Sequence, residues 1–390
     1  MLTLASRNVR ATGFPGDRRS VVARLRQGNS EPVELGSGEL LLATSETAVL
    51  PGQPVLILER DQAAVAPRTI GPAVIAPDAF EYLQDGDVVS IGLVRPGLRT
   101  LYRRSSPHNS FLLTERCNHY CLMCSQPPKD INDDWLVDEI LEAIPLIAKE
   151  TGEIGFTGGE PTLLGDRLLR LVSDMKAHLP NTALHILSNG RRFNDAGFAG
   201  AYAAIQHPDV MLGIPIYSSV SQVHDYVVQS DGAFDETVRG ILNLKAYGQR
   251  VEIRVVIHRQ NYRDLPMLAN FIARNLTFVD HVALMGLEMT GFAKANIETL
   301  WIDPANYREE LREAASLLDD HGLRTSIYNH QLCTVDRAVW PLAVRSISDW
   351  KNEYEPECEG CAVRDRCGGF FATGRLRRSN HIRAIETETH

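Results

Sequence analysis

The seven cysteines of this 390-residue chain fall into two groups with a long cysteine-free stretch between them. The first group lies within eight residues and the second lies near the end of the chain: Cys117, Cys121 and Cys124, then Cys333, Cys358, Cys361 and Cys367. Because seven is odd, a framework of paired disulfides is not expected. In a reducing cytoplasm, cysteines more often bind metals or take part in chemistry, so we expect two separate thiol sites.

Composition limits the classes of protein that need to be considered. Hydrophobic residues make up 44% of the chain and charged residues 23%, as in an ordinary globular protein. No apolar run approaches the roughly 18 residues of a membrane-spanning helix, and the first residues do not form a secretory signal. We therefore expect a cytoplasmic protein without a membrane partner. The formal net charge of −9 argues against non-specific binding of nucleic acid.

Hydrophobic patterns divide the chain into three expected domains. Residues 1–105 contain short strand-like runs, such as 55–60 and 88–94, and predict a small β-rich domain. Residues 106–303 alternate between strand and helix patterns, which indicates parallel β/α units. Residues 304–390 predict one helix at 304–320, a cysteine-rich extension and a loose tail.

The central segment predicts an α/β fold in the form of a partial (β/α)6 barrel. Its six expected strands, with the turns that end them, lie at 111–114, 153–160, 184–190, 210–217, 251–258 and 281–288. A helix pattern between the first two strands places Leu136, Ile140 and Ile144 on one face, and Pro145 is expected to break it. In such folds the active site lies at the carboxyl ends of the strands, where the glycine-rich and polar segments fall here.

Cys117, Cys121 and Cys124 follow the first strand of this barrel with the spacing Cx3Cx2C. A [4Fe–4S] cluster normally takes four cysteines, so three leave one iron open for an exchangeable ligand. A structural zinc site is instead closed by four ligands, and His119 lies within the loop at an awkward spacing for that role. Three buried cysteines without a metal are the remaining alternative.

This loop, directly after the first strand of a partial barrel, resembles that of the radical S-adenosylmethionine (SAM) superfamily. The resemblance implies that SAM chelates the open iron through its amino and carboxylate groups. An electron from the cluster then cleaves SAM to methionine and a 5′-deoxyadenosyl radical, which abstracts a hydrogen atom. The family usually has an aromatic residue before the last cysteine, near the adenine; here Met123 takes that place.

Further segments resemble SAM contacts of the same superfamily. They are Gly158-Gly159-Glu160 for the amino group, Ser188-Asn189 for the ribose and Arg254 for the carboxylate. Glycines allow a backbone to approach a ligand, and arginine forms charge-assisted bonds with a carboxylate. The first two segments are also explained as ordinary turns, and Arg254 as half of a structural ion pair.

The run Cys358-x2-Cys361-x5-Cys367 resembles SPASM and Twitch extensions, which carry auxiliary [4Fe–4S] clusters. Such a run often continues to a further cysteine, but here Phe371 stands in that region and no cysteine follows Cys367. If the site is all-cysteine, Cys333 is the fourth ligand. Four cysteines fill one cluster, which favours a Twitch-like extension. A four-cysteine zinc site remains the alternative.

Residues from about 85 to 371 also resemble a narrower family, the C-type radical SAM maturases of the His-Xaa-Ser system. The resemblance rests on the sequence around the first cysteines, VEIRVVIHRQN, ALMGLEMTGFA and SISDWKNEY. It implies a ribosomal peptide or small protein with His-Xaa-Ser repeats as substrate, a second radical SAM maturase as partner, and a reductase or other electron donor. The competing hypotheses are a radical SAM enzyme acting on a small molecule and a non-catalytic zinc-binding interaction protein.

No catalytic acid or base is assigned from the sequence. Tyr217, His224, His258 and Glu288 lie near expected strand ends, but each is equally well explained as a structural hydrogen-bonding residue.

Overall fold

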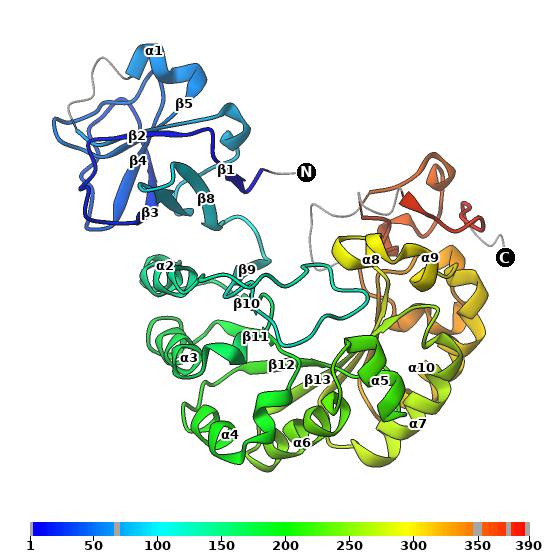
Figure 1. The fold of residues 1–390 in the computed structure, drawn as a ribbon. Coiled ribbons are helices and arrows are strands. Elements are labelled where there is room, and N and C mark those ends of the chain that lie inside the picture. The colour runs from blue at the N-terminus through cyan, green and yellow to red at the C-terminus, as the bar shows by residue number, and fades with distance from the viewer. Residues whose placement is uncertain (1–2, 66–70, 346–352, 372–375, 387–390) are drawn as a thin grey trace.

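The computed structural model describes residues 3–65, 71–345, 353–371 and 376–386, which form two separate sheets (Figure 1). The first sheet holds eight strands in the order β1-β8-β7-β3-β4-β5-β6-β2. Their bounds are β1 Ala5–Ser6, β2 Arg10–Thr12, β3 Ser20–Gln27, β4 Glu39–Ala43, β5 Val55–Leu58, β6 Ala73–Ala76, β7 Val88–Gly92 and β8 Gly97–Tyr102. The expected strands at 55–60 and 88–94 are β5 and β7.

This N-terminal sheet has its own hydrophobic core, in which Leu25, Leu56 and Ile91 are fully buried. Strands β3 to β6 pair in parallel in chain order, while β7 and β8 pair antiparallel. Burying these apolar side chains stabilises the sheet by about 1.5–3 kcal/mol each before the cost of ordering them. A β-rich N-terminal region is therefore confirmed, whereas the exact domain boundaries stay predictions.

The second sheet has seven strands in the order of the chain, and every neighbouring pair is parallel. Their bounds are β9 Asn109–Leu112, β10 Glu153–Thr157, β11 Ala183–Leu187, β12 Val210–Pro215, β13 Arg250–Ile257, β14 His281–Gly286 and β15 Thr325–Tyr328. The first six correspond to the six expected strands. The seventh, β15, extends the sheet beyond the six β/α units that the sequence predicts.

Helices cover the outer face of this curved sheet (Figure 1). Their bounds are α2 Trp135–Ala143, α3 Asp166–His178, α4 Ala196–Ala203, α5 Ser221–Val228, α6 Ala233–Ala246, α7 Leu265–Asn275 and α10 Arg308–Asp320, with the short α8 Gly291–Ala295 and α9 Ile297–Leu300 near the barrel mouth and α1 Gln62–Val65 in the first sheet's domain. Helix α2 ends before a 3-10 turn at Ile144–Leu146, which confirms the expected break at Pro145. The fold is thus an α/β partial barrel with a β-rich N-terminal part.

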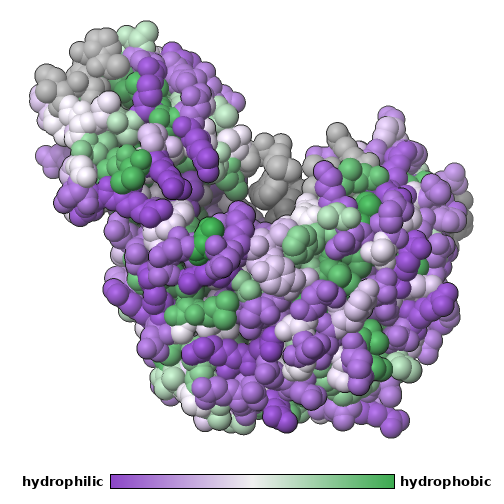
Figure 2. All heavy atoms as spheres, viewed as in Figure 1, coloured by the Kyte–Doolittle hydropathy of each residue, from purple (hydrophilic) through white to green (hydrophobic). Residues whose placement is uncertain are grey.

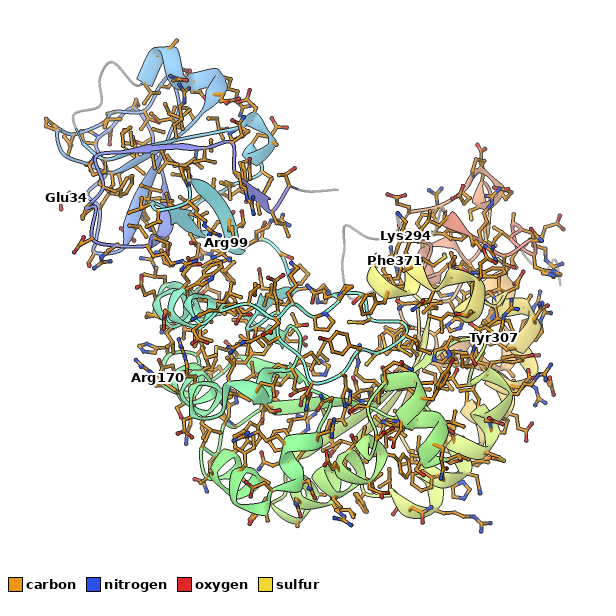
Figure 3. The ribbon with its side chains drawn as sticks, viewed as in Figure 1. Glu34, Arg99, Arg170, Lys294, Tyr307 and Phe371 are labelled. Carbon is orange, nitrogen blue, oxygen red and sulfur yellow. The ribbon has the colours of Figure 1, made fainter. Side chains whose placement is uncertain are left out.

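The N-terminal domain contacts the barrel through α2. The guanidinium groups of Arg19 and Arg99 lie over the Trp135 ring, at 4.7 and 4.6 Å from its centre. Glu139 is buried beneath them, where it pairs with Arg99 and accepts a hydrogen bond from Ser20 Oγ at 2.6 Å. Figure 3 labels Arg99 on the side of the domain that faces the barrel. Such cation–π contacts hold the two domains together at specific points.

The C-terminal extension packs beside α8 and α9 (Figure 1). Within the predicted loose tail, residues 377–386 have no regular secondary structure, but Asn380 N–H donates to Asp303 Oδ2 at 3.2 Å and Ala362 N–H donates to Ile385 O at 2.8 Å. The last four residues, 387–390, lie outside the described part. Among the described residues, no helix combines the length and apolar character needed to cross a membrane.

Candidate active site and auxiliary cysteine pocket

The loop after β9 carries the first three cysteines across the barrel mouth toward α8 (Figure 1). At its start, Asp133 is buried and accepts hydrogen bonds from Thr114 Oγ1 at 2.9 Å and Glu115 N–H at 2.5 Å. At its far end, Phe292 N–H donates to Cys124 O at 2.8 Å and Asn296 Nδ2 donates to Leu122 O at 2.9 Å. The loop is therefore held at both ends by the scaffold.

The three thiols of this loop are free and partly accessible. Burial raises the pKa of the Cys117 thiol to about 12, and the charge of Cys124 adds to the shift. Burial also raises the pKa of Cys121, again with contributions from Cys117 and Cys124. Cys121 is therefore close enough to both other thiols for their charges to act on it. Because binding to metal deprotonates a thiol outright, a cationic cluster would relieve the repulsion. The donor set fits an iron–sulfur cluster.

The glycine turn after β10 lies directly against this loop. Gly159 N–H donates to Thr114 O at 2.7 Å, and Glu160 N–H donates to Arg116 O at 2.8 Å. A Cβ atom on Gly158 would lie 2.4 Å from Thr114 O, and one on Gly159 only 2.0 Å from Arg116 O. Gly158 also has φ +144°, in the region that L side chains rarely adopt. Both glycines are therefore required for the turn to approach the loop.

Glu160 ties the end of β10 to the end of β11. Its side chain is buried, and its Oε1 accepts hydrogen bonds from Thr162 N–H at 2.9 Å and Ser188 Oγ at 2.8 Å. Its Oε2 accepts one from Asn189 N–H at 2.6 Å. Burial raises the pKa of Glu160, although these donors oppose the shift. The Glu160 carboxylate therefore positions the turns that follow β10 and β11. Its binding to the SAM amino group stays a prediction.

The structure brings most of the predicted SAM contacts together around the loop. Asn189 Nδ2 donates to Asn118 Oδ1 at 2.7 Å, which joins the Ser188-Asn189 turn to the residue after Cys117. Met123 is 6% exposed and packs with Tyr217 in a cluster that includes Cys121 and Leu122. The glycine turn, the serine–asparagine turn and the methionine thus surround the three cysteines, as the resemblance predicts. The contacts of these residues with SAM stay predictions.

Arg254 lies in the barrel interior, and its guanidinium is already partnered. Its Nη1 is 2.6 Å from Glu252 Oε1, and its Nη2 is 3.2 Å from Met285 Sδ. A Cβ atom on Gly213 of the adjoining strand would come within 2.9 Å of Arg254 Cδ, so this glycine makes room for the side chain. The structural ion pair considered above is therefore present. A role toward the SAM carboxylate stays a prediction.

Sequence reasoning missed the rest of the network around Glu252. His281 Nδ1 lies 2.6 Å from Glu252 Oε2, and His185 Nε2 lies 3.5 Å from Oε1. Burial alone would raise the pKa of Glu252, but the hydrogen bond with His281, the nearby His185 and the Arg254 charge outweigh it and hold this pKa well below its usual range. These neighbours therefore favour the ionised form of Glu252 inside the barrel. The signal available in the sequence was the polar residues interrupting otherwise apolar strands.

The four remaining candidate polar residues lie around the mouth without a defined chemical role. The Tyr217 ring centre is 5.8 Å from that of His224 and 6.3 Å from that of His258. Burial lowers the pKa of His224 to about 4 and that of His258 to about 3. Glu288 O accepts a hydrogen bond from Thr290 N–H at 3.0 Å. We assign none of them a catalytic function.

The low pKa of His258 predicts a loss of stability in acid. The folded protein keeps this imidazole neutral while the unfolded chain binds a proton below its ordinary pKa, so stability falls as the pH drops from about 6.5 toward 3. One such histidine costs about 2 kcal/mol between pH 7.5 and pH 5. In urea unfolding of the metal-free protein, His258→Leu should reduce the pH dependence by that amount, whereas replacing the exposed His178 should not. If the free energy of unfolding depended on pH equally in both variants, the low pKa of His258 would be contradicted.

The four late cysteines line a single pocket of about 320 Å³. Burial raises the thiol pKa of Cys333, with contributions from the charges of Cys367 and Cys358. Leu332 N–H donates to Cys367 Sγ at 3.5 Å, and Ile385 N–H donates to Cys361 Sγ at 3.4 Å. Cys333 therefore joins the cysteine run despite its distance in sequence, and the donor set fits a cluster. Among the described residues, no three His, Cys, Asp or Glu side chains surround a single-ion position.

A parallel α/β partial barrel with three cysteines and a glycine turn at its mouth defines the class of this domain. Residues 111–272 match the family model described as the radical SAM superfamily. Radical SAM proteins use a [4Fe–4S] cluster and SAM, so these are the cofactors that the cysteine loop and its surroundings fit.

The individual proteins to which the chain is similar share little sequence identity with it. The chain is 26% identical over 164 residues to Fe-coproporphyrin III synthase from Methanosarcina barkeri, covering 41% of this chain and 39% of the relative. It is also similar to SuiB from Streptococcus suis bound to SAM, with a TM-score of 0.45 and 17% identity over 56% of this chain and 50% of SuiB. For coproporphyrinogen III oxidase from Escherichia coli the TM-score is 0.44, with 14% identity over 56% of this chain and 54% of the oxidase. The chain thus spans about half or less of the length of these proteins.

Proposed function

We propose that this protein is a radical SAM maturase that cleaves SAM reductively at the Cys117, Cys121 and Cys124 site and modifies a ribosomal peptide with His-Xaa-Ser repeats. The observation that carries the first part is the close approach of the glycine turn to the loop, with Gly159 N–H bonded to Thr114 O at 2.7 Å. When bound, the cluster and SAM together supply the electron and the radical that abstracts hydrogen from the substrate.

The chain's own residues hold the reactants in place. The three thiolates would hold a [4Fe–4S] cluster with one position left for SAM, and the glycine turn and the Ser188-Asn189 turn would form the surrounding wall. Glu160 fixes both turns relative to each other through the hydrogen bonds described above. The buried apolar cluster around Met123 and Tyr217 excludes water from one side of the loop.

The open shape above the barrel supports a peptide substrate. Figure 2 shows the N-terminal domain and the C-terminal extension rising on either side of the barrel mouth. Two bordering parts of this kind would suit an extended chain better than an enclosed cavity would. As partners we propose a second radical SAM maturase and a cytoplasmic electron donor, both of which rest on the resemblance to the His-Xaa-Ser system.

The test is co-expression with a His-Xaa-Ser repeat peptide, followed by mass spectrometry of that peptide with and without the second maturase. A change in peptide mass that depends on Cys121 is the expected result. If the purified enzyme forms 5′-deoxyadenosine but leaves the peptide unchanged under both conditions, the peptide assignment is wrong. A small molecule would then be the better substrate hypothesis, as the name of the Methanosarcina relative suggests for that protein.

Replacing Cys361 by alanine tests the auxiliary site. Because the four late cysteines line one pocket, we expect the variant to lose about half of the iron while retaining part of the SAM cleavage. The uncoupled cleavage should yield 5′-deoxyadenosine without a modified peptide. Iron, sulfide and zinc are measured on the same samples. Loss of zinc with unchanged iron would instead assign the pocket to a structural zinc ion.

A further inference from the structure

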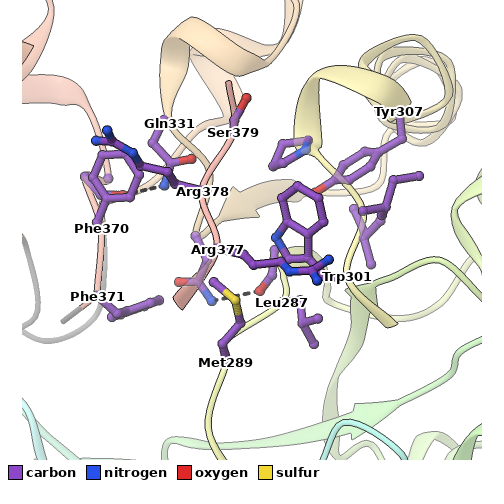
Figure 4. A pocket seen from close by; sticks show the side chains of 17 residues that line it. Leu287, Met289, Trp301, Tyr307, Gln331, Phe370, Phe371, Arg377, Arg378 and Ser379 are labelled. Atoms are coloured by element: carbon purple, nitrogen blue, oxygen red, sulfur yellow. Dashed lines mark hydrogen bonds between the residues drawn. The ribbon is translucent and has the colours of Figure 1, made fainter. Parts of the chain in front are cut away.

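A second pocket lies between the barrel and the C-terminal extension, next to the four-cysteine pocket (Figure 4). It has about 650 Å³ of empty volume, part of which is open solvent. The ends of β14 and β15 supply one wall, and the segments around 368–371 and 377–379 supply the other. We call it the interdomain pocket.

The interdomain pocket reaches toward both cysteine sites. Gln331, Gly369 and Phe370 line it and also line the four-cysteine pocket. On the opposite side, Leu287 lines the interdomain pocket and packs against the cluster that contains Cys121. A group bound here would therefore lie between the SAM site and the auxiliary site, where a reacting substrate residue has to be held.

The side chains of this pocket favour an uncharged ring. Trp301 provides a partly exposed indole, with the Arg377 guanidinium 5.6 Å from its ring centre, and the largely buried Tyr307, Phe370 and Met289 complete the apolar lining (Figure 4). The two arginines of the pocket already have partners: Arg377 pairs with Glu298, and Arg378 Nη2 lies 2.9 Å from Glu357 Oε1. Because these charges are compensated, the pocket has little to attract a phosphate or nucleotide.

The side-chain amides of Asn329 and Gln331 supply hydrogen-bond acceptors in the interdomain pocket. Asn329 Nδ2 donates to Gly286 O at 3.3 Å, and Gln331 Nε2 donates to Gly369 O at 2.7 Å. Since carbonyl acceptors require the NH2 end of each amide, the orientation of both amides is fixed. Within the described residues, nothing donates to either amide oxygen. Asn329 also has φ +60°, a left-handed conformation that asparagine tolerates.

We propose that the interdomain pocket binds an aromatic side chain of the polypeptide substrate whose ring carries an N–H or O–H donor. The aromatic walls take the faces of the ring, and the oxygens of Asn329 and Gln331 accept from its donor. This inference rests on the proposed function and narrows it, because it names the kind of residue held between the two cysteine sites. Histidine, with a neutral imidazole, is the ring of that kind in a His-Xaa-Ser repeat.

The test uses the anaerobically reconstituted full chain and fluorescent peptides with His-Ala-Ser, Phe-Ala-Ser or Leu-Ala-Ser repeats. Binding is followed by fluorescence anisotropy at pH 8.5, where free imidazole is neutral. We expect the histidine peptide to bind about three- to tenfold more tightly than the phenylalanine peptide, from one hydrogen bond. The leucine peptide should bind most weakly.

Two variants isolate the acceptors. Asn329→Gly keeps the left-handed backbone and removes one amide, so the histidine peptide should lose part of its advantage over the phenylalanine peptide. Combining Asn329→Gly with Gln331→Leu removes both amides and should lower the affinity of the histidine peptide to that of the phenylalanine peptide. Equal affinity of the three peptides, no binding of any peptide, or equal weakening of all three by Asn329→Gly would each overturn the proposal. Formation of 5′-deoxyadenosine by the wild-type enzyme without peptide tests SAM cleavage separately, so the two failures are distinguishable.

Discussion

Replacing Cys121 by alanine is expected to abolish the formation of 5′-deoxyadenosine from SAM. Cys121 is the middle of the three cysteines of the loop, and the charges of Cys117 and Cys124 add to the burial that raises its pKa. Without it, only two cysteines of the loop remain, too few to hold the cluster at three irons. After anaerobic reconstitution, the variant is mixed with reductant and SAM, and the product is quantified by liquid chromatography and mass spectrometry.

The matched control is the same substitution at Cys361, which lies in the other cysteine pocket. Both variants lose one thiol, but only Cys121→Ala removes a ligand of the SAM-binding cluster. We expect iron to fall in both and SAM cleavage to vanish in Cys121→Ala alone. If Cys121→Ala retained full cleavage, the cluster would be assigned to the wrong cysteines. If wild-type protein fully loaded with iron formed no 5′-deoxyadenosine, the enzyme hypothesis itself would fail.

Hydrophobic periodicity was sufficient to predict the six β/α units, but it did not predict the final strand, β15. β15 has only four residues, Thr325–Tyr328, with alternating burial that is too short to distinguish from a loop. Its place is determined by parallel pairing with β14 and by contact with the extension. In the N-terminal domain, the parallel neighbours β3 to β6 are likewise set by tertiary packing, because their patterns specify strands but not an order.

The candidate site was predictable where its residues are close in sequence. The cysteine loop and the glycine turn are each a few residues long, so spacing alone identified them. The Glu252 network was not predicted, since His185 and His281 lie far from it in the chain and are brought alongside only by strand register. Cys333 was inferred by counting ligands, and the shared pocket now places it beside Cys358, Cys361 and Cys367.

The Gly159→Ala substitution should disable the enzyme without touching a cysteine or a charge. A methyl group there would lie 2.0 Å from Arg116 O, and the next nearest atoms, Arg116 C and Glu115 C, are also backbone, which cannot easily shift. Two of the hydrogen bonds that join the turn to the loop run beside this position, from Gly159 N–H and Glu160 N–H. We expect a loss of about 3 kcal/mol in stability and a loss of about a hundredfold in SAM cleavage, because the loop and the turn can no longer hold their relative positions.

Gly152→Ala is the matched control, made just before the same strand β10. Gly152 has nothing within 4 Å of an added Cβ atom, so this substitution adds the same methyl group without a clash. It should leave unfolding by urea and SAM cleavage close to wild type. Iron content and SAM binding are measured alongside, since a displaced loop lowers both whereas a globally unfolded chain also loses its far-ultraviolet circular dichroism. Wild-type cleavage by Gly159→Ala would mean that the loop and the turn need not be in contact, and the reason for assigning SAM to this side of the barrel mouth would be lost.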